Sequence, residues 1–183
     1  MAHDLILTRR RALGFTVLLL GCGARTTVAP GGGSPDLTAA IADGDLVDRA
    51  LSKAMPSIAT TYPALFSSTR VAPSDVTLWL KDASLSLDAA TRFGASPSGR
   101  SMLTQGIGYL DRAMNVAAPI TVAVDPALGP VIAGAAVLLA VMEQTLTPPQ
   151  AGVTAPAATR ALALAPRMSP EEARARLRAF TGN

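Results

Sequence analysis

Apolar residues recur at helical spacing through most of the chain from residue 37 onward. The clearest stripe has apolar side chains alternately four and three positions apart: Leu103, Ile107, Leu110, Met114 and Ala117. Residues with this spacing share one face of an α-helix. Four polar residues of the same segment fall away from that face: Arg100, Gln105, Asp111 and Arg112. The pattern therefore predicts an amphipathic helix whose apolar stripe faces a core.

Two earlier segments show the same periodicity. The first region has apolar residues at helical positions: Leu37, Ile41, Ala50, Leu51, Ala54 and Ile58. We expect it to be interrupted near Gly44 and to end around Pro56, because glycine and proline disfavour helix interiors. In the second segment Ser74 is a candidate N-cap. The residues that would share its apolar face, with Trp79 beside them, are Val76, Leu80, Ala83, Leu87 and Ala90.

A fourth helix is predicted from Pro126 to about Leu146, because Pro148 and Pro149 would stop it. Its centre is apolar on all sides and uncharged between Asp125 and Glu143. Such a helix lies either in the middle of a bundle or in a membrane. We favour the buried helix because alanine and glycine gain little from transfer to lipid, and membrane insertion of residues 126–146 is the alternative.

The C-terminal segment begins with a helix-start pattern. Ser169 is the predicted N-cap, Pro170 the first helical residue, and Glu171 and Glu172 suit the positive end of the helix dipole. The arginines that follow are Arg174, Arg176 and Arg178. They predict a solvated polar face, with contact to anionic lipid as the alternative. With a proline-rich linker at residues 147–156, the fold expected is all-α: a bundle of four main helices plus a short C-terminal helix.

The N-terminal residues indicate export and anchoring. Leu19-Leu20-Gly21-Cys22 closes an apolar run, residues 12–21, that follows three arginines. The run is about ten residues long, too short to span a bilayer. This arrangement resembles the signal of a bacterial lipoprotein. The resemblance implies cleavage before Cys22, lipid on its thiol and removal of residues 1–21. An ordinary secretory signal with a chance cysteine is the alternative.

The segment Thr8–Leu13 also resembles the twin-arginine export motif, with Arg9 and Arg10 as the paired arginines. That resemblance implies that the protein can fold before export, whereas a plain basic segment would serve general secretion. Residues 23–36 are rich in glycine and proline and predict a flexible tether. The expected organisation is a signal peptide (1–21), a lipidated cysteine with its tether (22–36) and a helical domain (37–183).

Charge and composition narrow the chemistry. The chain has 16 basic and 13 acidic residues, a net charge of +3. Without the signal, which holds three arginines and one aspartate, 13 basic and 12 acidic residues remain, so the mature chain offers no basic surface typical of nucleic-acid binding. The single histidine, His3, also lies in the signal. Histidine-based catalysis and zinc, copper or haem sites are therefore not expected, and we predict no cofactor and no metal.

Two acidic candidates remain. Asp43, Asp45 and Asp48 surround Gly44 and could suggest calcium, but they lack the ligand spacing of an EF-hand. We interpret the segment as a turn in which Asp45 caps a helix. Glu143 could act alone as the acid of a peptidoglycan-cleaving enzyme, although a solvated residue is expected at that position and no partner carboxylate is evident.

The function predicted is a non-enzymatic lipoprotein of the cell envelope, anchored through Cys22 on the extracytoplasmic side, in the outer membrane if the host has one. Its helical domain would bind a protein partner or serve a structural role. The signal, the alanine-rich body and the tail Met168–Arg174 together resemble small prophage-region lipoproteins of high-GC bacteria. A membrane-active protein using residues 126–146 is the first alternative, and a carboxylate-based cell-wall hydrolase is the second.

Overall fold

Six α-helices and no strand make up the part of the chain that the computed structural model describes, residues 37–146 and 168–182. The helices, in chain order, are α1 (Leu37–Thr61), α2 (Pro63–Thr69), α3 (Pro73–Phe93), α4 (Pro97–Ala117), α5 (Gly129–Leu146) and α7 (Pro170–Thr181). The prediction of an all-α fold with four main helices and a short C-terminal helix is confirmed. The short helix α2 is an addition that the sequence pattern did not predict, since seven residues are too few to establish a periodicity.

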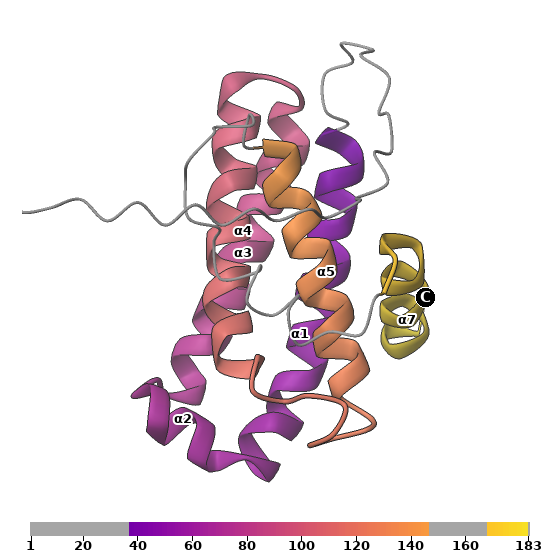
Figure 1. Cartoon of the computed structure of the whole chain (residues 1–183). Helices are drawn as coiled ribbons and strands as arrows, with labels where there is room; N and C mark the ends of the chain where they lie inside the picture. The colour runs from indigo at the N-terminus through magenta and orange to yellow at the C-terminus, as the bar shows by residue number, and fades with distance from the viewer. Residues whose placement is uncertain (1–36, 147–167, 183) are drawn as a thin grey trace, which may run out of the picture. The chain divides into compact units, whose positions relative to one another are not determined.

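The four long helices α1, α3, α4 and α5 pack around a common core (Figure 1). α3 and α4 form a hairpin through a short turn, and α7 packs against α5 and α1. The predicted inner faces are the observed ones: Leu103, Leu110 and Ala117 on α4 are fully buried, as are Leu87 and Ala90 on α3. Apolar burial along the 3.6-residue repeat thus orients each helix.

Gly44 does not interrupt the first helix, because it lies inside α1 where the helix approaches α3 closely. A Cβ atom at this position would lie 2.8 Å from Cδ2 of Leu87 on α3, so only glycine fits without a shift. Glycine costs a helix interior about 1 kcal/mol relative to alanine. The close packing it permits explains why the helix continues, and the predicted interruption is wrong.

Pro56 does not end α1, which continues to Thr61. Proline removes one N–H donor and leaves a carbonyl one turn earlier without its partner. Pro56 and Ser52 lie on the exposed side of α1, where water can solvate that carbonyl. Met55 and Ile58 on either side of the proline are buried, and their packing holds the last turns in place. The predicted end at Pro56 is therefore wrong.

Two helix starts differ from the sequence prediction. α3 begins at Pro73 and its N-cap residue is Ala72, whose N–H donates to Oδ2 of Asp75 over 3.0 Å. Ser74 is thus the second helical residue rather than the cap. α5 begins at Gly129 rather than Pro126, because the Asp125 carboxylate accepts hydrogen bonds from the two N–H groups of residues 127 and 128 and forms a turn there.

The start of α7 agrees with its prediction. Ser169 is the N-cap, its hydroxyl accepts from the N–H of Glu172 over 3.2 Å, and Pro170 is the first helical residue. Capping by a side chain three positions away is a local interaction, which is why sequence alone located it.

α5 lies in the interior of this arrangement and contacts α1, α4 and α7. Leu138, Leu139 and Met142 are fully buried. By length and composition it is the one helix in residues 37–146 and 168–182 that could cross a membrane. A core helix that neighbours cover on several sides needs the same apolar composition.

Candidate functional site

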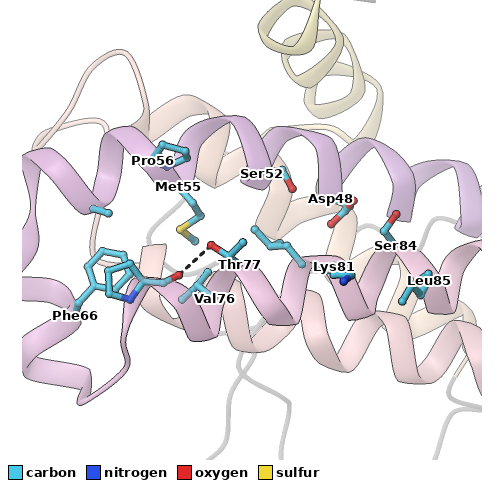
Figure 2. A pocket seen from close by; sticks show the side chains of 13 residues that line it. Asp48, Ser52, Met55, Pro56, Phe66, Val76, Thr77, Lys81, Ser84 and Leu85 are labelled. Atoms are coloured by element: carbon cyan, nitrogen blue, oxygen red, sulfur yellow. Dashed lines mark hydrogen bonds between the residues drawn. The ribbon is translucent and has the colours of Figure 1, made fainter.

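A groove of about 600 Å³ lies between α1 and α3 and extends to α2 (Figure 2). We call it the α1–α3 groove. Its apolar lining residues come from all three helices: Met55, Ala59, Phe66, Val76, Leu80 and Leu85. Its polar lining residues include Asp48, Ser52, Thr77, Lys81 and Ser84. An apolar hollow with a few polar groups is the usual composition of a ligand site.

The groove arises from small side chains on the facing sides of two helices. On α1 the lining positions 48, 52, 55 and 59 recur at helical spacing, and Ser52 and Ala59 are small. Ser84 on α3 is small as well and belongs to the same lining. Side chains of this size leave space between the two helix surfaces that larger residues would fill. Phe66 on α2 belongs to the apolar end of the groove, opposite Asp48 in Figure 2.

Asp48 is the chemically unusual residue of the groove. Its Oδ1 atom is buried and no hydrogen-bond donor of the described residues reaches it. The pKa of this carboxyl is raised to about 6, chiefly by burial and also by the nearby charge of Asp45, while Arg49 acts in the opposite direction. Lys81 lines the same groove from α3 but does not donate to this oxygen. The groove therefore contains an acceptor without a partner.

We expect Asp48→Asn to stabilise the fold at about pH 7.5 and to lose this advantage in acid. The folded-state pKa is raised, so the native state binds the proton more readily and its stability falls as pH rises from about 4 through 6. A rise of the pKa from about 4 to about 6 corresponds to about 3 kcal/mol, which solvent screening at this partly exposed carboxyl reduces to about 1 kcal/mol. Urea unfolding at several pH values measures the difference.

Asp88→Asn, at an exposed carboxylate of α3, is the matched control and should change stability by less than about 0.5 kcal/mol. A gain for Asp48→Asn that stays the same between about pH 4 and 7.5 would contradict the assignment.

The acidic segment around Gly44 has a different role from the predicted one. Asp43, Asp45 and Asp48 all lie inside α1, so Asp45 caps no helix and that interpretation is wrong. No group of three His, Cys, Asp or Glu side chains in the described ranges is arranged to hold a metal ion. The α1 helix is continuous here because Gly44 is packed against α3, and continuity places Asp43 and Asp48 on different sides of it.

Asp43 is buried and pairs with Arg174 of α7. Arg174 Nε donates to Oδ1 over 2.8 Å and Nη2 donates to Oδ2 over 2.7 Å, a bidentate ion pair. Arg174 is therefore neither part of a solvated face nor directed to lipid, and that prediction is wrong for this residue. Arg176 is exposed and pairs with Glu172 on its own helix, as a solvated face requires.

Glu143 is partly buried, in contrast to the solvated position expected. Burial raises its pKa, and the charge of Asp111 on α4 raises it further. The pKa of Asp111 is raised by burial too, although a hydrogen bond from Asn115 opposes this. Sequence spacing could not reveal this neighbour, because Asp111 and Glu143 lie on different helices. Neither residue lines the α1–α3 groove.

The remaining predicted site residues, Cys22 with Arg9 and Arg10, lie outside the described residues, as do the tether and the linker at 147–156. Comparison with protein-family models, with curated proteins and with solved structures finds no match to this chain. The fold and the groove define a class of protein: an all-α bundle with an open, mostly apolar groove on one side and a partly buried carboxylate, Asp48, at one end of the groove.

Proposed function

We propose that the protein is a lipid-anchored, non-enzymatic binding module of the cell envelope. Cys22 would carry the anchor, and the α1–α3 groove would be the binding surface. The observation that carries the binding role is the groove itself, whose volume of about 600 Å³ lies within the range of ligand sites. The anchor rests on the apolar run and small residue before Cys22.

The chemistry of the mature chain supports binding rather than catalysis. A chain that begins at Cys22 contains no histidine, and its one thiol would be acylated. The carboxylates that a cell-wall hydrolase would use, Glu143 and Asp111, lie on α5 and α4, away from the groove lining. A glycosidase needs its two carboxyl groups on either side of a bound substrate. The groove offers Asp48 as its single carboxylate.

The surroundings of α5 support a core role over membrane insertion. Its glycine at position 134 faces Leu177 of α7, where an added Cβ would lie 3.5 Å from Leu177 Cδ2. Leu177 and Ala173 of α7 are fully buried. Insertion of α5 into lipid would require the loss of these contacts and of the contacts with α1 and α4. We therefore place the binding activity in the groove and not in α5.

We expect Cys22→Ser to abolish the lipid modification. The protein should then either be released from membranes or remain as an uncleaved precursor. The physical reason is that Cys22 is the one thiol in the chain to which the diacylglycerol could be attached, and each buried CH₂ contributes about 0.8 kcal/mol to membrane attachment. Fractionation and mass spectrometry of the full chain measure the change. Wild-type protein should begin at Cys22 and carry added acyl mass.

The matched control is Cys22→Ser combined with Ser34→Cys, which restores a thiol away from the predicted cleavage point. It should not restore the lipid. An unmodified Cys22 in membrane-extracted wild-type protein, or a mature N-terminus elsewhere, would show that the anchor proposal is wrong.

A further inference from the structure

Three large apolar side chains protrude from the side of α3 that is turned away from the core, which we call the outer α3 face. Leu78 is 54% exposed, Leu85 58% and Phe93 54%, and these are three of the five exposed large apolar side chains in residues 37–146 and 168–182. Single exposed leucines are normal on a soluble protein. Three such side chains along one side of one helix form an apolar strip, which is typical of an interaction surface.

The spacing of the three side chains makes the outer α3 face complementary to itself. Leu85 lies seven residues after Leu78, close to two helical turns, and Phe93 lies eight residues after Leu85. At about 1.5 Å per residue, Leu85 is roughly midway, about 10 Å from Leu78 and about 12 Å from Phe93 along the helix. An antiparallel copy of α3 centred on Leu85 would therefore place leucine on leucine and each Leu78 beside Phe93 of the other copy.

Charged side chains favour the antiparallel orientation. Lys81 and Asp88 are exposed on the same flank of α3, four residues before Leu85 and three residues after it. Neither forms an ion pair within the part of the chain that the structure describes. In an antiparallel pair each Lys81 faces Asp88 of the other copy, whereas a parallel pair would place like charges opposite each other. Asp82 lies on the opposite flank, and Arg92 lies one turn beyond Asp88.

We propose that α3 pairs with α3 of a second copy of this chain, in antiparallel orientation and about a two-fold axis at Leu85. The proposal goes beyond the proposed function, because it concerns assembly and not what the groove binds. Lys81 and Leu85 also line the α1–α3 groove, at the end where Figure 2 labels Asp48, so the second copy borders that end. One helix face is smaller than the interface of a stable dimer, and we expect a Kd of about 1 μM or weaker.

Disulfide formation between full-length chains in detergent micelles tests the pairing and its orientation. In the antiparallel arrangement Leu85 meets its own copy, whereas Leu78 lies roughly 20 Å along the helix axis from its own copy. A disulfide needs two Cα atoms within about 7 Å of each other. Under mild oxidation we therefore expect Leu85→Cys to form a dimer and Leu78→Cys to form none. A mixture of Leu78→Cys and Phe93→Cys chains should form the mixed dimer.

Mass spectrometry of the linked peptides identifies the two positions joined in each dimer. The wild-type chain is the control, because any disulfide through Cys22 would form in it as well.

Substitutions measure how much the leucine and the charges contribute, with sedimentation of the full chain in micelles as the readout. Leu85→Asp places two carboxylates at the two-fold axis and should raise the Kd about tenfold or more. Val124→Asp, at a valine that is 53% exposed between α4 and α5, is the matched control and should change the Kd by less than about twofold. Lys81→Asp should raise the Kd about fivefold, and addition of Asp88→Lys should restore it, because the pair is then reversed in both copies.

Every outcome supports or overturns the pairing. Dimers of Leu85→Cys without dimers of Leu78→Cys, and recovery by the reversed charge pair, support it. The absence of a Leu85→Cys dimer, equal dimer formation by both variants, or equal effects of Leu85→Asp and Val124→Asp would overturn it. So would a Leu85→Cys thiol that phospholipid vesicles alone shield from a water-soluble maleimide, since the outer α3 face would then contact lipid. None of these results requires lipid on Cys22 or a ligand in the groove, so the proposed function is tested separately.

Discussion

Leu110→Asp is expected to unfold the helical domain. Leu110 is fully buried at the centre of the apolar stripe of α4, where that helix packs against α3, α5 and α1. Burial of an unpaired carboxylate costs several kcal/mol, which is comparable with a total stability of about 5–15 kcal/mol. Circular dichroism at the helical bands, followed through urea or thermal unfolding, measures the loss.

Gln105→Asp places the same side chain on the exposed side of α4 and is the matched control. Its effect should stay within about 0.5 kcal/mol, as for most surface substitutions. An unchanged melting temperature for Leu110→Asp would show that the inner face of α4 has been assigned wrongly.

Arg174→Met is expected to destabilise the domain by about 3–5 kcal/mol. The substitution leaves the Asp43 carboxylate buried without its partner, and the loss of one member of a buried pair is much costlier than the loss of an exposed pair. The side chain of Asp43 is 8% exposed, so water cannot replace the guanidinium. Urea unfolding at about pH 7.5 measures the change, and Ala173 and Leu177 on α7 should become accessible in the same transition.

Arg176→Met is the control within the same helix. Arg176 pairs with Glu172 over the same 2.7 Å, but both side chains are about half exposed, so the loss should be below 1 kcal/mol. The double variant Asp43→Leu with Arg174→Met should recover most of the stability, since it removes both charges together. Equal effects of Arg174→Met and Arg176→Met would contradict a buried ion pair.

The Arg174 pair also explains how α7 joins the bundle. α7 has only twelve residues and follows a segment that lies outside the described residues. A helix of that length is marginal by itself in water. Its two buried side chains, Ala173 and Leu177, pack against α5, and the ion pair joins it to α1. The position of α7 is thus set by tertiary contacts, although its start is set locally by Ser169.

The sequence by itself located the five longer helices of the described residues and the buried faces of α3 and α4. The stripe at Leu103, Leu110 and Ala117 is found in the core, and so is the α3 face that includes Leu87. The cap of α7 at Ser169 was predicted as well. These features depend on interactions over one or two helical turns, so they can be predicted from a periodicity or a short motif. The proposal of an export signal around Cys22 rests on sequence alone.

Only the tertiary structure decided how these helices meet and what lies between them. α1 continues through Gly44 and Pro56 because α3 packs against the first and solvent surrounds the second. Asp43 and Arg174 are 131 positions apart, and no spacing rule joins them. The groove depends on small residues of α1 facing α3. In the sequence Asp48 is only a weak calcium candidate, because the burial of its Oδ1 atom depends on how the helices pack.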